Sequence, residues 1–480
     1  MAPELKGYIF AVLYGILCLL LAVVLHKFGV AKKYCRKAVH ILVGFEWVIL
    51  YFFMGASIHF LVVCLAFLAL LTVIYFKNIL PMISSDGDNA PGTVYYCVAM
   101  SIMAFICLFV PDLMLPFGIG VFCTSFGDGF AGIVGQSIKK CNPKIFRNKS
   151  LLGALANFAF SFAAALVFKY AFDMGLSVWQ CALIAFLSVQ LELIGAFGLD
   201  NIFITLGTAF LAYAFISFPV INSYIAPIVL TPLVIILVIQ KKALTTKGLI
   251  AALVLDLVIS LTLGNFGFIL LLSFLVASIL IDKVKKMRKS SDSITKRGDC
   301  RDEIQVIANG LIPMMLAVIF SCTFNPVFLV AYVAVLAEAF ADTAASGFGV
   351  FSKSTFDLFK MRKCECGISG GMSVYGTLAS LVGAFAFSLL VLPFGIKNLL
   401  IIIIVTVSAF LGVIFDSLLG SLLQVKYKCT VCGSLTEREW HCEKPTKQVS
   451  GYRFFDNDVV NITSAVFSAA VSILMFLLIY

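Results

Sequence analysis

The chain has 480 residues, of which 61% are hydrophobic and 12% are charged, and its mean hydropathy is +1.06. A soluble protein of this length needs far more polar surface than these residues supply, so the composition excludes a soluble globular enzyme. The formal net charge of +10 is explained by basic loops between apolar segments, so it does not indicate nucleic-acid binding.

Apolar runs of about 17–24 residues recur along the whole chain, which is the length that an α-helix needs to cross a bilayer. Because lipid forces the backbone to satisfy its own hydrogen bonds, we predict an all-α polytopic membrane protein with about sixteen transmembrane helices. In chain order the predicted spans are 7–26, 38–55, 58–76, 93–110, 117–138, 151–170, 178–197, 202–217, 224–240, 245–263, 266–282, 303–322, 327–350, 372–394, 398–422 and 458–479.

Basic residues fall almost entirely on one side of this predicted topology. If the spans alternate, the other side receives only Lys6, Lys169 and Lys397 of the 35 lysines and arginines. Positively charged loops face the cytoplasm, so we expect both termini outside and the polar clusters on the cytoplasmic face. This one-sided placement favours a reaction with a cytosolic reagent over a conducting path.

The chain divides into two helical-bundle modules, 1–240 and 241–480, at the basic doublet Lys241–Lys242. Both modules place an acid, Asp128 or Asp342, near the inner end of a span. In each module a basic loop follows, and the next span opens with Ser-x-x-Gly-x-Leu-Ala. Small residues are common in membrane helices, so chance is an alternative, but the shared order favours an internal repeat.

Acidic side chains inside membrane spans are costly and are usually functional. Asp128, Asp342 and Asp416 each lie among apolar and small neighbours. Their carboxylates are hard oxygen ligands that suit Mg²⁺, an ion that needs only one or two carboxylates beside substrate phosphates. The alternative is a structural carboxylate that caps a helix or pairs with a basic loop.

Basic residues near Asp128 would supply the positive charge that phosphoryl transfer requires. Arg36, Lys37 and Lys149 are the candidates, with Ser150 at a predicted helix start. His40 follows Arg36 by four residues and therefore shares its helical face, where it could act as a general base. A structural, hydrogen-bonded histidine is the alternative. The chain has no Walker A or Gly-rich kinase loop, so a nucleotide site would be of another kind.

The predicted cytoplasmic loop 423–457 carries a metal-binding pattern. Cys429 and Cys432 form a CxxC pair, and His441 and Cys442 follow. Four such ligands fit a closed structural Zn²⁺ site that would cross-link the loop. Reduced thiols without a metal are the alternative. We expect most other cysteines to be small buried apolar residues.

Five short motifs run in order through about residues 30–205. Their defining residues are Arg36, Lys37, His40, Gly44, Gly92, Thr93, Tyr95, Tyr96, Gly127, Asp128, Asn148, Lys149, Ser150, Gly153, Gly198, Asp200 and Asn201. Together they resemble the dolichol kinase and phytol kinase family. The resemblance implies a CTP-dependent lipid-alcohol kinase. It departs at Leu152, where an acidic residue is common, and at Ala154, where Thr or Ser is usual.

For this first module we expect catalytic roles for Asp128, Lys149 and His40. The resemblance implies that the substrate or nucleotide is bound by Arg36, Lys37, Thr93, Tyr95, Ser150, Asp200 and Asn201.

A second set of motifs covers about residues 245–480. Its residues are Arg301, Asp302, Gln305, Asn309, Asp342, Thr343, Ser346, Gly370, Gly371, Ser373, Gly376, Asp416, Ser417, Gly420, Gln424, Asn457, Asp458 and Asn461. They resemble the plant phytyl-phosphate kinases and the transmembrane protein 19 group, in which the cysteine cluster is also familiar. Gly347 stands where that family usually has Glu, and Glu338 could compensate.

For this second module we expect Asp342, Asp416 and Asp458 to be catalytic, with Mg²⁺ at the first two. The resemblance implies that substrate or nucleotide is bound by Arg301, Gln305, Asn309, Ser346, Ser373, Asn457 and Asn461.

These resemblances imply a bifunctional membrane kinase for isoprenoid salvage. The first module would convert an isoprenoid alcohol to its monophosphate with CTP, and the second would convert the monophosphate to the diphosphate. The choice between CTP and ATP for each half stays open. The expected cofactors are Mg²⁺ and a structural Zn²⁺. Two alternatives are a lipid transporter or flippase, which can also have related halves, and a CTP-dependent cytidylyltransferase.

Overall fold

The computed structural model describes residues 2–77, 79, 91–138, 142–195, 198–287, 300–352, 354–357, 359, 362–364, 370–437 and 439–480. Within these residues, fourteen helices are long and apolar enough to cross a membrane. The predicted all-α polytopic class is therefore confirmed. The predicted sixteen spans exceed this count for two reasons. The apolar helix Val178–Ile194 is shorter than the fourteen and is not among them. The segment Thr246–Met287 is counted once, although Gly264, where φ is 58°, interrupts it.

Two compact units divide the chain. Unit 1 comprises Met1–Asn222 and Ile228–Ile236, and unit 2 comprises Ser223–Pro227 and Leu237–Tyr480. The division falls within the short helix Pro219–Tyr224 and the helix that follows it, Ile225–Lys241. The sequence boundary at residues 240 and 241 is close to its end.

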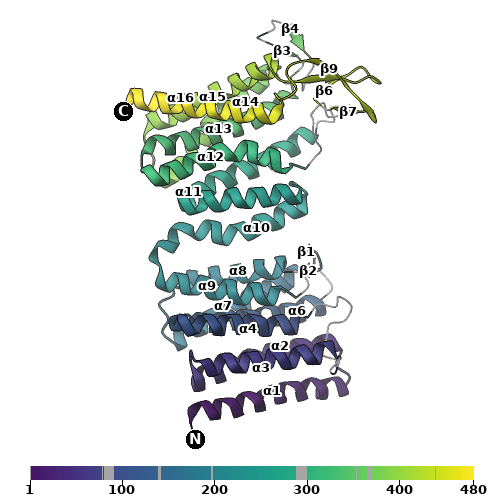
Figure 1. Ribbon diagram of the computed structural model, residues 1–480, viewed down its shortest axis with the longest axis vertical. Coiled ribbons are helices and arrows are strands. Elements are labelled where there is room, and N and C mark those ends of the chain that lie inside the picture. The colour runs from purple at the N-terminus through teal and green to yellow at the C-terminus, as the bar shows by residue number, and fades with distance from the viewer. Residues whose placement is uncertain are drawn as a thin grey trace. The chain divides into compact units, whose positions relative to one another are not determined.

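Unit 1 is a bundle of helices that run side by side (Figure 1). Its elements are α1 (Pro3–Lys27), α2 (Lys32–Met54), α3 (Ile58–Phe76), α4 (Gly92–Phe109), η1 (Pro111–Leu113), α5 (Met114–Phe122), η2 (Cys123–Asp128), α6 (Gly129–Ser137), β1 (Lys144–Phe146), β2 (Lys149–Ser150), α7 (Leu151–Ala171), α8 (Val178–Ile194), α9 (Asp200–Ser217), η3 (Pro219–Tyr224) and α10 (Ile225–Lys241), which continues into unit 2.

Unit 2 is a second helical bundle. Its elements are α11 (Thr246–Met287), α12 (Glu303–Thr323), α13 (Pro326–Gly349), β3 (Thr355–Asp357), β4 (Arg362–Cys364), α14 (Val374–Ser388), η4 (Leu389–Phe394), α15 (Leu399–Leu422), β5 (Lys426–Lys428), β6 (Leu435–Thr436), β7 (Trp440–His441), β8 (Lys444–Pro445), β9 (Lys447–Ser450) and α16 (Asn457–Ile479).

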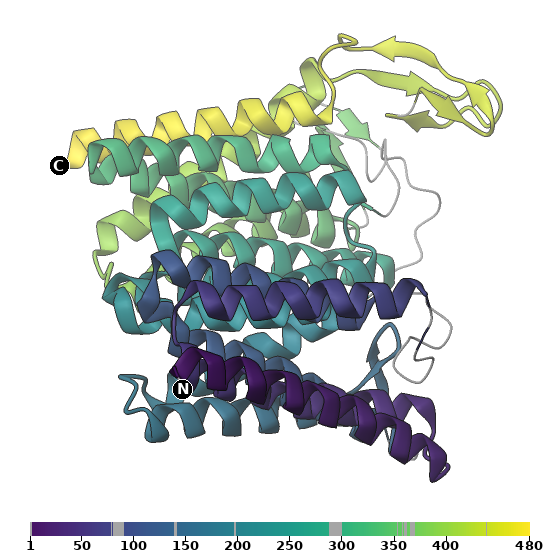
Figure 2. The same ribbon diagram turned by 60° about the horizontal axis from the view of Figure 1, so that its bottom comes forward.

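Helix α13 forms the centre of unit 2, because its small and β-branched residues let neighbouring helices approach closely. Tyr332, Val335 and Ala337 are fully buried there, and helices α14, α15 and α16 pack around them. Strands β5, β6 and β9 form an antiparallel sheet in the order β6-β5-β9. Figure 2 shows the yellow-green strands beyond the end of α16 that lies away from the C-terminus.

Both units begin one helix with the same serine cap. The Ser150 hydroxyl accepts a hydrogen bond from the Gly153 N–H at 3.3 Å, and α7 starts there. The Ser373 hydroxyl accepts one from the Gly376 N–H at 3.1 Å, where α14 starts. A serine in this position satisfies a backbone donor that the first helical turn leaves unpaired. The repeated sequence pattern therefore corresponds to a repeated local structure.

The glycine of each cap lies against the acid-bearing helix of its own unit. A Cβ atom on Gly153 would lie 3.1 Å from the Ala131 carbonyl oxygen, and one on Gly376 would lie 3.0 Å from the Ala345 carbonyl oxygen. Each alanine follows the acid of its unit by three residues. Because only glycine allows this close approach, both units pack the capped helix against the acid-bearing helix in the same register.

Candidate functional site

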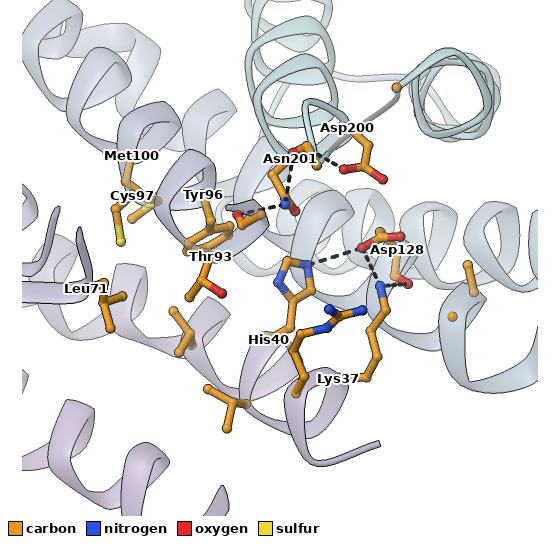
Figure 3. A pocket seen from close by; sticks show the side chains of 18 of the residues that line it. Lys37, His40, Leu71, Thr93, Tyr96, Cys97, Met100, Asp128, Asp200 and Asn201 are labelled. Carbon is orange, nitrogen blue, oxygen red and sulfur yellow. Dashed lines mark hydrogen bonds and ion pairs between the residues drawn. The ribbon is translucent and has the colours of Figure 1, made fainter. Parts of the chain in front are cut away.

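Asp128 is the centre of a polar cluster in unit 1 (Figure 3). It ends the π-helical turn η2, a type of distortion that is frequent at functional sites. Its Oδ2 atom lies 2.6 Å from Nζ of Lys37 and 3.5 Å from Nε2 of His40. Its Oδ1 atom lies 3.9 Å from Nζ of Lys149. Three predicted site residues from α2 and β2 therefore converge on the predicted acid.

Lys149 joins three carboxylates. Its Nζ atom lies 3.0 Å from Glu192 Oε1 and 3.3 Å from Asp200 Oδ2, in addition to Asp128. Burial alone would lower the pKa of Lys149, but the carboxylates of Glu192, Asp128 and Asp200 outweigh it and raise the pKa above its usual range. Asn157 Nδ2 donates to the other Glu192 oxygen at 2.8 Å. Glu192 thus belongs to the cluster, although it lies in none of the five sequence motifs.

His40 is oriented by the backbone of η2. Its Nε2 atom lies 3.0 Å from the Thr124 carbonyl oxygen, which can only accept a hydrogen bond. We therefore assign the proton of the neutral ring to Nε2, which leaves Nδ1 as the nitrogen that can accept a proton. The Tyr96 ring packs edge-on at 5.5 Å between centroids. This tautomer is compatible with the predicted general-base role.

A cavity of about 470 Å³ opens beside this cluster, within the size range of small-molecule sites. Its lining includes Arg36, Thr93 and Ser150 together with the Asp128 cluster. Its other walls are largely apolar, with Leu71, Cys97 and Met100 visible in Figure 3. Further apolar lining residues are Val39, Val43, Leu50, Phe67 and Leu70.

The cavity follows α2 away from the charged cluster. From His40 to Leu50, both of which line it, the helix rises by about 15 Å. Asn201 ties the charged end together, because its Nδ2 atom donates to the Gly92 carbonyl oxygen at 3.0 Å. Tyr95, predicted to bind substrate, is not among the lining residues, whereas its neighbour Tyr96 is. On a helix, adjacent residues point about 100° apart, which explains this difference.

Unit 2 also gathers carboxylates, from the packed helices α13 and α15 and from the loop that follows β6. Asp416 on α15 lies close enough to Asp342 and Glu338 on α13 for electrostatic interaction, and also to Glu437. Ser464 of α16 donates to Glu338 Oε1 at 2.9 Å. The two predicted magnesium ligands therefore lie within electrostatic range of each other. Glu338 and Glu437 also belong to this group. From the sequence, Glu338 was considered only as a possible compensation for the Glu that is missing at Gly347, and Glu437 was not predicted. We call these four acids the unit 2 carboxylate cluster.

At the start of α12, the predicted binding residues Gln305 and Asn309 make local contacts, and Arg301 pairs with the segment before α11. Asp302 and Gln305 form a reciprocal capping box, in which the Gln305 N–H donates to Asp302 Oδ1 at 3.0 Å. Asn309 Nδ2 donates to the Gln305 carbonyl oxygen at 2.9 Å. The Arg301 N–H donates to the Ala243 carbonyl oxygen at 3.0 Å. The contacts of Asp302, Gln305 and Asn309 are therefore those of a helix start.

The remaining predicted residues of unit 2 lie at helix ends. Ser346 is exposed on α13 and donates to the Thr343 carbonyl oxygen at 3.0 Å. Ser373 caps α14. Asn457 begins α16, the predicted catalytic Asp458 is buried next to it, and Asn461 lies one turn further on.

The predicted zinc ligands lie together in the strand-rich loop of unit 2. One ligand atom from each of Cys429, Cys432, His441 and Cys442 lies within 4.8 Å of all the others. His441 Nδ1 is 3.5 Å from Cys432 Sγ and 3.3 Å from Cys442 Sγ. A hydrogen bond from the Cys432 backbone N–H lowers the pKa of the Cys429 thiol to about 7. Such a set can form a closed tetrahedral metal site.

Comparison with known proteins finds relatives that match parts of this chain. An uncharacterized membrane protein of Methanocaldococcus jannaschii is 31% identical over 201 residues, which are 40% of this chain and 80% of that protein. A phytol kinase of Synechocystis sp. is 32% identical over 145 residues, 29% of this chain and 61% of that kinase. Protein VTE6, chloroplastic, of Arabidopsis thaliana is 25% identical over 244 residues, 48% of this chain and 65% of that protein.

No solved structure matches the chain significantly. The family described as "Integral membrane protein DUF92" matches residues 229–469. This match spans half of the chain. It includes the unit 2 carboxylate cluster and the four predicted zinc ligands in the loop 423–457. The chain therefore belongs to the DUF92 family of integral membrane proteins.

Proposed function

We propose that unit 1 is a kinase that phosphorylates an isoprenoid alcohol. The observation that carries this proposal is a single cavity with the Asp128 cluster at one end and apolar side chains along the rest. A lipid alcohol matches both parts, because its hydroxyl needs the charged end and its hydrocarbon tail needs the apolar walls. The similarity to a phytol kinase supports the same substrate class.

In the proposed reaction the alcohol oxygen attacks the γ-phosphorus of a nucleoside triphosphate. An O–P bond forms, the bond from the γ-phosphorus to the bridging oxygen breaks, and the nucleoside diphosphate leaves. The hydroxyl proton passes to Nδ1 of His40, the unprotonated nitrogen of the ring. Lys37 and Lys149 neutralise the charge that develops on the phosphoryl oxygens, which is the main requirement of this chemistry.

Asp128, Glu192 and Asp200 are the residues of unit 1 that fit Mg²⁺. All three present hard oxygen atoms around Lys149, and such ligands are the ones that Mg²⁺ prefers. When bound, Mg²⁺ would supply positive charge that neutralises the nucleotide phosphates. CTP is the proposed donor, on the basis of the resemblance of residues 30–205 to CTP-dependent lipid-alcohol kinases.

Unit 2 is proposed to phosphorylate the resulting monophosphate to a diphosphate. Three observations support this second step: the shared local structure of the two units, the carboxylate cluster around Asp416, and the resemblance of residues 245–480 to phytyl-phosphate kinases. Asp342 and Asp416 are the proposed Mg²⁺ ligands. A monophosphate with an apolar tail could then reach the second site without leaving the membrane, and the product would be an activated prenyl donor.

Mass spectrometry of lipid products tests both steps. The purified full chain in detergent receives Mg²⁺, one alcohol among farnesol, geranylgeraniol and phytol, and either CTP or ATP. Monophosphate should appear first and diphosphate later, and the nucleotide that supports each step identifies its donor. A product that carries a CMP group would instead show a cytidylyltransferase. The absence of products with every alcohol and nucleotide would contradict the kinase and favour a transporter.

A further inference from the structure

The metal-type cluster of unit 2 is built from two hairpins. The first, β5–β6, has Cys429 directly after β5, and the Cys429 N–H donates to the Ser434 carbonyl oxygen at 2.9 Å. Cys432 lies in its turn. The second, β7–β8, carries His441 and Cys442. The two hairpins therefore meet at the four ligand atoms.

The geometry of this cluster fits zinc. Zn–S bonds of about 2.3 Å and Zn–N bonds of about 2.0 Å in a tetrahedron place sulfur and nitrogen about 3.5 Å apart. The two distances from His441 Nδ1 to thiol sulfurs are 3.5 Å and 3.3 Å. The Val431 N–H donates to Cys429 Sγ at 3.4 Å, an arrangement that stabilises a thiolate. Four protein ligands leave no open position, so a metal here would be structural.

The β5–β6 hairpin also carries a carboxylate toward the C-terminal end of α15. Glu437 directly follows β6, and its side chain is only 7% exposed. Gln424, two residues beyond the end of α15, donates from Nε2 to Glu437 Oε1 at 3.1 Å. Gln424 is itself buried, and its N–H donates to the Leu419 carbonyl oxygen at 3.0 Å. Glu437 is thus fixed between the hairpin and the helix that bears Asp416.

The position of Glu437 depends on the shape of the hairpin. The strands that hold it are two or three residues long, and the turn between them contains a glycine at φ 73°. Hairpins this short are marginally stable without further support. A metal ion that joins the turn to the neighbouring hairpin would supply that support, as structural zinc does in small domains.

We propose that Cys429, Cys432, His441 and Cys442 bind one Zn²⁺, and that this ion holds Glu437 at the unit 2 carboxylate cluster. Glu437 is then a positioning and charge-setting residue of the second site, and the zinc supports unit 2 alone. The effect on catalysis rests on the proposed function of unit 2, whereas the metal and the placement of Glu437 do not.

The test uses the purified full chain and the variants Cys432→Ser, Cys442→Ser and Glu437→Gln. Metal analysis should find about one zinc per chain in the wild type and in Glu437→Gln, and much less in both cysteine variants. Cys322→Ser, at an exposed cysteine of α12 outside the cluster, is the matched control and should keep its zinc. A wild type that holds no zinc, even after zinc is added, overturns the proposal.

Backbone hydrogen exchange of residues 424–437 reads the position of Glu437 without any activity. Protection should fall in the cysteine variants and persist in Cys322→Ser. Conversion of monophosphate to diphosphate should fall about tenfold or more in the cysteine variants and in Glu437→Gln, with phosphorylation of the alcohol unchanged. Loss of zinc with unchanged exchange overturns the proposal. If the wild type makes no diphosphate but exchange responds to zinc, the function proposed for unit 2 fails while the metal site stands.

Discussion

Asp128 interacts with more charged groups than any single role as a helix cap would require. Lys37, His40 and Lys149 all lie within 4 Å of its carboxylate. Its charge therefore holds two lysines in place, and its carboxylate is also a proposed Mg²⁺ ligand. Asp128→Asn keeps the size of the side chain and removes the charge.

We predict that Asp128→Asn lowers alcohol phosphorylation by about 100-fold or more and leaves monophosphate phosphorylation intact. Asp342→Asn should have the reverse effect. Each step is measured separately, by supplying the alcohol or the monophosphate. Asp112→Asn, at an exposed acid on η1, is the control and should retain both activities. Equal loss of both activities in each variant would contradict two separate sites.

Glu46 is a second acid of the unit 1 cavity, about 9 Å beyond His40 along α2. It lines the cavity, is 6% exposed, and its Oε1 atom has no hydrogen-bond partner among the residues that the structure describes. Water can solvate this oxygen while the cavity is open. An apolar tail that reaches Glu46 would displace that water and leave the oxygen unpaired, at a cost of about 1–3 kcal/mol.

Glu46 should therefore limit the length of the alcohol. We predict that Glu46→Leu raises the ratio of kcat/KM for geranylgeraniol to that for farnesol by about tenfold. Glu46→Gln, which keeps a polar group there, should preserve the wild-type ratio. An identical ratio in the wild type and Glu46→Leu would show that the tail does not cover Glu46.

The sequence motifs marked most of the residues that the structure gathers around Asp128. Asp128, Lys149 and Asp200 lie in polar clusters at span ends, and the structure brings them together. Glu192 had only the general signal of an acid in an apolar helix, which does not name a partner. Glu437 lies in a polar loop, where an acidic residue is ordinary, so only the folded hairpin reveals its burial.

At the scale of elements, both units contain the same contact between a serine-capped helix and an acid-bearing helix. Unit 1 places its acid at a π-helical turn between α5 and α6, whereas unit 2 uses the continuous helix α13. The contact of the capped glycine with the acid-bearing helix is nonetheless the same. A methyl group at either glycine would push on a backbone oxygen that cannot rotate away.

We predict that Gly153→Ala destabilises unit 1 by about 1–3 kcal/mol and impairs alcohol phosphorylation alone. Gly376→Ala should act in the same way on unit 2 and monophosphate phosphorylation. Thermal unfolding in detergent and the two separate assays measure this. Gly175→Ala is the control, because no described atom lies within 4 Å of the added methyl group. Full activity and unchanged stability in both cap variants would show that the neighbouring helix yields without cost.

Hydropathy located the helices because each long apolar run has few other stable forms in lipid. The run 245–282 was predicted as two spans, and in the structure the non-helical residue Gly264 separates two helices there. The short strands in 423–457 were not predicted. Strands of two to four residues are too short for an alternating pattern, and paired hairpins rather than local sequence define them.

On the scale of the whole molecule, each unit gathers acidic side chains beside a serine-capped helix. At the first site, Lys37 and Lys149 pair with the acids. At the second site, Glu338 and Asp342 interact electrostatically with Asp416. A metal ion that binds between such acids depends on the number of carboxylate oxygens that it can reach.

A change at one site should therefore alter the Mg²⁺ requirement of one step alone. We predict that Glu338→Gln raises the free Mg²⁺ concentration at which monophosphate phosphorylation reaches half its maximal rate, because it removes one carboxylate next to Asp342 and Asp416. The requirement of alcohol phosphorylation, measured at the same nucleotide concentration, should stay unchanged. Identical Mg²⁺ curves of the second step in the wild type and in Glu338→Gln would mean that Glu338 does not contribute to the metal site of unit 2.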